Sequence, residues 1–152
     1  DNMEINLADL RGRVVLLDFW SLSCAACFKE LPELNEIAKK YPQDKFVLIS
    51  LMDDTKDELL RKFDTKKDGY KMKKPIFRND DVNFQIIPDA REIMKLYTDQ
   101  LVFPRAFIID QNGVVVRHFV GYAEERGVPD EQTTKGVLTQ EITRLLRSTA
   151  SK

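Results

Sequence analysis

The sequence predicts an α/β fold in which a central mixed β-sheet carries helices on both faces. In the first half of the chain, apolar runs typical of buried strands alternate with amphipathic helical segments, and this order requires parallel strands joined by crossover helices. Near the end, a strand–turn–strand pattern and one more amphipathic segment add antiparallel strands and a last helix. A chain of 152 residues can build one core, so we expect a single domain over residues 1–152 with its core in about residues 4–147.

The first predicted elements are a strand, a long helix and a second strand. Residues 13–20, RVVLLDFW, and residues 46–52, FVLISLM, combine aliphatic and aromatic side chains as buried strands do. Between them, residues 24–41 have apolar side chains at helical spacing. The inward face of this helix is expected to hold Leu31, Leu34, Ile37, Ala38 and Tyr41.

Two capping patterns predict the next helices. Thr55 and Glu58 form a T-x-x-E capping box, which opens a helix that carries Leu59, Leu60 and Phe63. Asp89 and Glu92 predict a similar start, which leads into Ile93, Leu96 and Tyr97. The charged residues 66–81, KKDGYKMKKPIFRNDD, fit the pattern least, and we expect a solvated loop or insertion there, with a docking surface as the alternative.

The last part of the chain is predicted to be a β-hairpin followed by a helix. Residues 105–110, RAFIID, form a strand, and Gln111-Asn112-Gly113 is a hairpin turn. Residues 114–122, VVVRHFVGY, form the returning strand. Residues 131–147 form the final helix, whose inward face holds Val137, Leu138, Ile142, Leu145 and Leu146.

The charge balance points to no nucleic-acid or membrane partner. The chain has 24 basic and 25 acidic residues and a net charge of −1. Its longest apolar run, VVLL at residues 14–17, is far too short to span a bilayer. Because the chain opens with Asp1, we expect a missing upstream segment, and only that segment would carry an export signal or membrane anchor.

The two cysteines, Cys24 and Cys27, form a C-x-x-C pair at the start of the predicted long helix. A structural zinc site needs four ligands, and the chain has no other cysteine and one histidine, His118, so we expect no zinc. Copper held by two thiolates and a histidine remains an alternative, although we expect His118 to be an ordinary half-exposed strand residue.

The remaining chemistry for the pair is dithiol–disulfide exchange. The first cysteine lies at the positive end of the helix dipole, among unpaired backbone N–H groups that favour its thiolate. The second lies one turn further on, nearer the core and within bonding reach of the first. We therefore expect Cys24 to attack a substrate and Cys27 to resolve the mixed disulfide.

Two acids are predicted to lie in the core near the pair. At about 100° per residue, Glu30 falls on the apolar face of the helix, about one turn from Cys27. It is expected to exchange a proton with Cys27, and the alternative is a half-buried carboxylate stabilised by the helix dipole. Asp18 interrupts the buried strand six residues before Cys24. Two buried carboxyls do not ionise independently, so we expect at least one pKa well above its reference value.

The segment VVLLDFWSLSCAACFKELP resembles the active-site segment of the thioredoxin superfamily. Its form C-x-x-C-x-x-E-x-P is similar to the TlpA/ResA-like branch, whose members are extracytoplasmic thiol–disulfide oxidoreductases. The leading segment NLADLRGRVVLLDFW resembles the branch's short strand and Leu-x-Gly turn, and VFPRAFIIDQNGVVVRHFVG resembles its later cis-proline segment. The resemblance implies a thioredoxin-like fold with an N-terminal extension and a central insertion.

The resemblance also implies roles for particular residues. Pro104 takes the cis-proline position facing the cysteines, and the backbone of Phe103 pairs with a bound substrate strand. Glu30 matches the branch's buried glutamate, and Asp18 matches the buried aspartate of thioredoxin itself. Trp20 matches a lid beside the cysteines, and a core aromatic is its other interpretation; the two interpretations do not exclude each other.

Three departures from the family pattern affect the expected substrate site. Ser23 stands before Cys24 where the family usually has tryptophan, which removes a large apolar wall. Phe103 is bulkier than the usual threonine, valine or isoleucine. The stretch between Cys27 and Pro104 is longer than in a minimal thioredoxin. None of these departures removes a reacting group.

The sequence therefore predicts a monomeric thiol–disulfide oxidoreductase without a cofactor. It would act as a reductant on protein substrates and with an upstream redox partner, and the family resemblance implies a location outside the cytoplasm. The alternatives are a disulfide-forming oxidant, a binding module with a structural disulfide, a peroxide-reducing enzyme on the same fold, and copper delivery.

Overall fold

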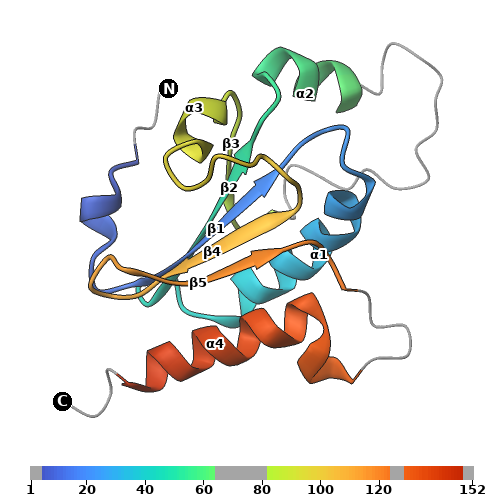
Figure 1. Ribbon diagram of the computed structural model, residues 1–152. Coiled ribbons are helices and arrows are strands. Elements are labelled where there is room, and N and C mark those ends of the chain that lie inside the picture. Colours follow the sequence, from blue (N-terminus) through green and yellow to red (C-terminus); the bar gives the residue numbers. More distant parts are fainter. Residues whose placement is uncertain (1–4, 64–81, 124–128, 149–152) are drawn as a thin grey trace.

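A five-stranded mixed β-sheet forms the centre of the computed structural model, which describes residues 5–63, 82–123 and 129–148. The strand order is β3-β2-β1-β4-β5 (Figure 1). β1 pairs in parallel with β2 and antiparallel with β4, β3 is parallel to β2, and β5 is antiparallel to β4. The strands are β1 Val14–Trp20, β2 Phe46–Met52, β3 Gln85–Ile87, β4 Arg105–Ile109 and β5 Val115–Val120. The predicted central mixed sheet is confirmed.

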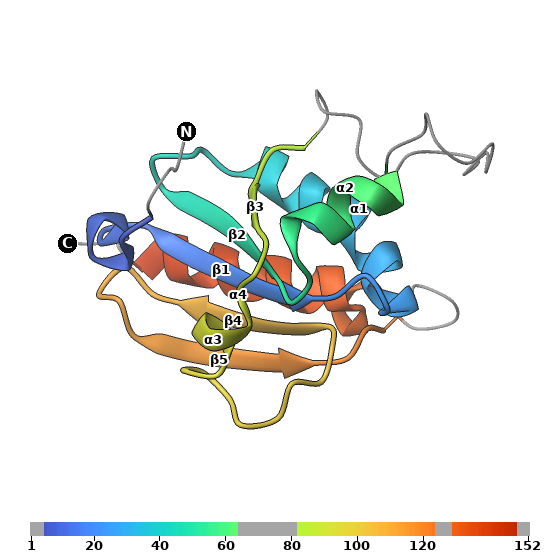
Figure 2. The same cartoon turned by 90° about the horizontal axis from the view of Figure 1, so that it is seen from above.

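Helices cover both faces of this sheet, as predicted (Figures 1 and 2). The long helices α1, Ala25–Lys40, and α4, Thr134–Ser148, pack on one face over a large core cluster. The short helix α3, Arg91–Met94, covers the other face over a second cluster. The remaining helical segments are η1 Leu7–Leu10, α2 Lys56–Phe63 and η2 Asp130–Gln132. In the described part of the chain, no helix is both long and apolar enough to cross a bilayer.

The alternation of side chains along β1 decides which of them face α1. Val14, Leu16 and Trp20 belong to the core cluster beneath α1 and α4, whereas Val15, Leu17 and Phe19 belong to the opposite cluster. Successive side chains of a strand point to opposite faces, so Asp18 shares the face of Leu16 and Trp20. The strand therefore places this carboxyl under the helix that carries the cysteines.

The predicted strands and the two long helices are confirmed to within a few residues. The capping box is present: Glu58 N–H donates to Thr55 Oγ1 at 3.1 Å, and Thr55 N–H donates to Glu58 Oε2 at 2.8 Å. The turn after β4 is closed by Gly113 at φ +80°, a left-handed conformation that glycine adopts without strain. Residues 66–81, predicted to be a loop or insertion, lie outside the described residues.

The predicted capping start at Asp89 is wrong. Asp89 has φ +57°, and its N–H donates to the carbonyl of Asp54 at 2.9 Å. Ala90 is the N-cap residue of α3, which is only four residues long. Ile93, within α3, is 44% exposed, and Leu96, beyond the end of α3, is 82% exposed. Long-range backbone bonding to the segment after β2 overrides the local capping pattern.

Three smaller expectations differ from the structure. The short strand expected in the leading segment is instead the 3-10 helix η1, followed by the expected turn at Gly12 with φ +86°. The final helix begins at Thr134 rather than at residue 131, because the preceding residues form η2. β3 was not predicted, since three residues are too few to show a strand period.

Candidate active site around the cysteine pair

The two cysteines are joined by a disulfide at the start of α1. Cys24 is the N-cap residue, and its Sγ accepts a hydrogen bond from the N–H of Cys27 at 3.1 Å. Cys24 is partly exposed, whereas Cys27 is 1% exposed and belongs to the core cluster beneath α1. A reagent in solvent can therefore reach the first sulfur more readily than the second.

A polar turn leads into Cys24. The N–H of Cys24 donates to the carbonyl of Ser21 at 3.1 Å, and the hydroxyls of Ser21 and Ser23 lie 2.7 Å apart. Ser23 is exposed, and its own N–H donates to Ser21 Oγ at 3.2 Å. Position 23 thus presents a small hydroxyl beside the cysteine pair.

The loop before β4 contains the cis peptide bond expected from the resemblance, between Phe103 and Pro104. Pro104 is buried, and its carbonyl accepts a hydrogen bond from the N–H of Gly121 at 2.8 Å. The partly buried Phe103 packs against both core clusters, including the one that contains Cys27. Its neighbour Val102 is 51% exposed.

Trp20 is a core residue. Its side chain has no exposed surface, and its ring makes an edge-to-face contact with Phe28 at a centroid distance of 5.9 Å. The core interpretation of Trp20 is therefore confirmed, and its ring offers a substrate no contact surface in this structure.

Asp18 and Glu30 form a pair of buried acids beneath the cysteines. Asp18 on β1 is 1% exposed and Glu30 on α1 is 3% exposed. Ser50 on β2 donates a hydrogen bond from Oγ to Asp18 Oδ2 at 2.9 Å, while the buried Oδ1 of Asp18 has no hydrogen-bond partner in the described part of the chain. Glu30 lies three residues after Cys27 on the same helix, so the two side chains are neighbours on its inner face. The predicted inward orientation of both acids is confirmed.

The burial of these acids keeps them protonated to an unusually high pH. Burial raises the pKa of Asp18 to about 7, an effect that the hydrogen bond from Ser50 opposes. Burial, followed by the negative charges of Asp18 and Glu33, raises the pKa of Glu30 to about 9. The expected upward shift is thus present in both acids. Because each charge disfavours the other, the pair titrates as a unit that can hold or accept a proton near neutral pH.

This pair gives a prediction for stability. The folded-state pKa values lie above the ordinary values of 3.8 for Asp18 and 4.5 for Glu30, so between about pH 4 and pH 9 the folded state binds more protons than the unfolded state. The free energy of unfolding should therefore fall as pH rises through this window, by about 1.4 kcal/mol per pH unit for each acid that is protonated in the folded state and ionised in the unfolded state. Chemical unfolding at a series of pH values measures this slope. Glu30→Gln should reduce it, and equal slopes for the two proteins would contradict the assignment.

His118 does not lie with the cysteines. Its ring stacks on Phe107 at a centroid distance of 4.9 Å, and its Nε2 lies 3.1 Å from Nη1 of Arg105. Phe107 belongs to the core cluster on the face opposite α1. Among the described residues, no group of three or more histidine, cysteine or acidic side chains is arranged to hold a metal ion. The geometry therefore does not support copper binding by the cysteines and His118 together.

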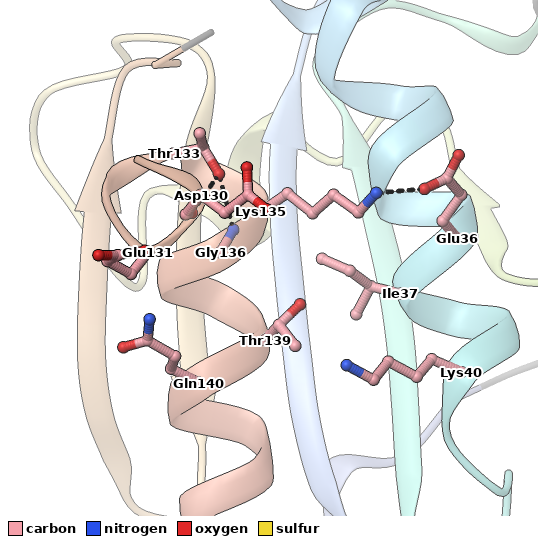
Figure 3. A pocket seen from close by; sticks show the side chains of 10 residues that line it. All are labelled: Glu36, Ile37, Lys40, Asp130, Glu131, Thr133, Lys135, Gly136, Thr139 and Gln140. Atoms are coloured by element: carbon pink, nitrogen blue, oxygen red, sulfur yellow. Dashed lines mark hydrogen bonds and ion pairs between the residues drawn. The ribbon is translucent and has the colours of Figure 1, made fainter. Parts of the chain in front are cut away.

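A cavity of about 510 Å³ lies between α1 and the start of α4, away from the cysteines (Figure 3). Glu36, Ile37 and Lys40 line it on α1, and an ion pair between Lys135 and Glu36 crosses it. Neither cysteine and neither buried acid borders this cavity. The cysteine pair and this cavity are separate features of the molecule.

Sequence reasoning missed three residues near the pair. Ser50 is the one polar residue in the run FVLISLM, and that signal could have identified it as a partner for Asp18. Asp54 and Lys62 hydrogen-bond to the backbone of Leu22 from positions 32 and 40 residues further along the chain. No local pattern indicates such distant contacts.

A mixed sheet with this strand order, a C-x-x-C pair at the start of α1 and a cis-proline loop together define the class of thioredoxin-like proteins. The sequence model of the AhpC/TSA family matches residues 1–118, and the chain belongs to this family.

Known proteins of related sequence and structure agree with this placement. The thiol-disulfide oxidoreductase ResA of Bacillus thuringiensis subsp. konkukian is 31% identical over 121 residues, which is 80% of this chain and 62% of that protein. The chain thus spans less than two thirds of the length of this relative. A protein of Chlorobium tepidum assigned as thiol:disulfide interchange protein DsbE superposes with a TM-score of 0.68 and 28% identity, over 93% of this chain and 86% of that one. The exposed lipoprotein thioredoxin Etrx1 of Streptococcus pneumoniae shares the fold, with a TM-score of 0.64 at 20% identity over 91% of this chain and 90% of that one.

Proposed function

We propose that this protein is a thiol–disulfide oxidoreductase that exchanges disulfides with protein substrates through Cys24 and Cys27. The observation that carries the proposal is the disulfide itself, with a partly exposed sulfur at the helix N-cap and a buried sulfur one turn below, above two buried acids. The relatives named as thiol-disulfide oxidoreductases support the same reaction class.

In the proposed reaction, the reduced protein transfers two electrons to a substrate disulfide. The Cys24 thiolate attacks one substrate sulfur, the substrate S–S bond breaks, and the departing sulfur takes up a proton from solvent. Cys27 then gives its proton to the ionised member of the Asp18–Glu30 pair and attacks the sulfur of Cys24. The mixed disulfide breaks, the second substrate sulfur leaves as a thiolate and takes up a proton from solvent, and the protein is left with the Cys24–Cys27 disulfide.

Each surrounding residue has a proposed role in this scheme. The backbone of Phe103, held by the buried Pro104, pairs with an extended substrate segment. The exposed Ser23 lines the approach to Cys24, and Trp20 supports the cysteine turn from below. The reaction needs no cofactor, because both electrons reside on the two sulfurs.

We further propose that the protein acts as a reductant outside the cytoplasm. Its C-x-x-C-x-x-E-x-P motif resembles the TlpA/ResA-like branch, and a buried proton acceptor beside Cys27 favours the dithiol as the attacking form. In this role the chain works as a monomer, and an upstream redox partner returns it to the dithiol state.

Redox titration against glutathione tests the direction of transfer. A reductant is expected to have a potential near about −270 mV, as thioredoxin has, because its disulfide form is the more stable one. A potential near about −120 mV would instead identify a disulfide-forming oxidant. Cysteines that resist both reduction and alkylation in the native protein would contradict redox exchange altogether and favour a structural disulfide.

A further inference from the structure

The turn before Cys24 is held from both sides by two charged side chains. The N–H of Leu22 donates to Asp54 Oδ2 at 2.7 Å, and its carbonyl accepts a hydrogen bond from Nζ of Lys62. Asp54 follows the end of β2, and Lys62 lies in the last turn of α2. These two hydrogen bonds therefore attach the backbone of Leu22, two residues before Cys24, to the segment that follows β2.

The ammonium group of Lys62 also lies over the ring of Phe28, 5.1 Å from the ring centroid. Phe28 directly follows Cys27, and Leu22 precedes Cys24 by two residues. The ammonium group thus contacts the chain on both sides of the cysteine pair. A cation over an aromatic face is attracted to it, so this second contact limits where the ammonium can lie.

A positive charge at this position favours a negative charge on Cys24. Other ionisable groups near the pair include Asp54 on the segment after β2, the buried acids Asp18 and Glu30 below Cys27, and Glu33 on α1, whose charge acts on Glu30. Asp54 acts in the opposite sense to Lys62, and the N-terminus of α1 acts in the same sense. Because Lys62 is exposed, salt should screen its contribution.

We propose that Lys62 is a positioning residue for the reaction: its ammonium group fixes the turn that carries Cys24 and stabilises the Cys24 thiolate. This inference rests on the proposed function, because a role for Lys62 in the reaction presupposes disulfide exchange at Cys24. Its evidence is the pair of contacts to Leu22 and Phe28, which the disulfide chemistry does not require.

The test measures the pKa of the Cys24 thiol from the pH dependence of iodoacetamide alkylation, in the reduced full chain with Cys27→Ala so that one thiol is present. Lys62→Met keeps the aliphatic length and removes the charge, and it should raise the thiol pKa by about 0.5 at low salt. Lys62→Arg should restore most of the shift. Lys56→Met, at the exposed start of the same helix, is the matched control and should leave the thiol pKa within about 0.1 of the parent value.

A variant of Asp54 separates charge from structure. Asp54→Asn keeps an oxygen that can accept the hydrogen bond from Leu22 but removes the negative charge, so it should lower the thiol pKa. In about 1 M salt, the shifts of both variants should shrink. Equal values for Lys62→Met and Lys56→Met, shifts in the same direction for Lys62→Met and Asp54→Asn, or shifts that salt does not change would each overturn the proposal. Alkylation needs no substrate disulfide, so these outcomes are distinct from a failure of the proposed function, which would appear as an unreactive disulfide in the unchanged protein.

Discussion

Replacing Cys24 with alanine is expected to abolish disulfide exchange, to below about 0.1% of the rate of the unchanged protein, because the attacking sulfur is lost. Replacing Cys27 with alanine should instead allow the first attack and block the second step. Mass spectrometry after incubation with a protein disulfide should then show a stable mixed disulfide on Cys24. The asymmetry follows from the partial exposure of Cys24 and the near-complete burial of Cys27.

In the comparison of the two cysteine variants, each variant serves as the control for the other. Each lacks one sulfur and the disulfide, so general effects on stability are shared by both proteins. Equal trapping by the two variants would show that the attacking and resolving roles are assigned wrongly. Trapping by Cys24→Ala alone would reverse them.

Replacing Glu30 with glutamine is expected to slow release of the substrate from the mixed disulfide by roughly 100-fold at about pH 9, where the carboxyl of Glu30 is ionised, within the usual range for loss of a general base. The buried Cys27 thiol must lose its proton before it attacks, and Glu30 is its neighbour on the inner face of α1. Burial and the charge of Asp18 raise the pKa of Glu30 to about 9, so the rate in the unchanged protein should rise with pH up to that range. In the variant, this part of the pH–rate profile should disappear.

Single-turnover measurements of the second step, from about pH 5 to pH 10, test this prediction. Glu36→Gln makes the same chemical change on the exposed face of α1 and serves as the matched control, with an unchanged profile expected. Thermal unfolding of each variant checks that the fold is intact. We expect it to be intact, because glutamine has nearly the same shape as a protonated glutamate. An unchanged pH–rate profile in Glu30→Gln would show that Glu30 is a structural buried acid and that Asp18 or water accepts the proton of Cys27.

The part of the site that could be predicted from sequence depends on local patterns. The spacing of the cysteines and their place at a helix start predicted the disulfide pair, and the helical period predicted that Glu30 points inward. The apolar character of residues 13–20 made a carboxyl at Asp18 conspicuous, and burial explains why its pKa is raised. The cis peptide bond before Pro104 was expected only from the family resemblance.

Contacts between segments far apart in the chain could not be predicted from such local patterns. The hydrogen bond from Ser50 to Asp18 depends on the register of β1 and β2, in which these two residues are partners. The contacts of Lys62 depend on where α2 lies against the cysteine turn. The same cause explains the error at Asp89, whose backbone bonds to Asp54 across the fold.

By itself, the sequence determined the cysteine pair at a helix start, the strands and long helices around it, and the inward direction of both acids, because these follow from residue type and from spacing within one element. Only the tertiary structure decided which distant groups meet: that Ser50 donates a hydrogen bond to Asp18, and that a lysine from α2 reaches the turn before Cys24. The physical reason is that hydrogen bonds and electrostatic interactions act over a few ångströms, and only the pairing of strands and the packing of helices bring segments this far apart in the chain within that range.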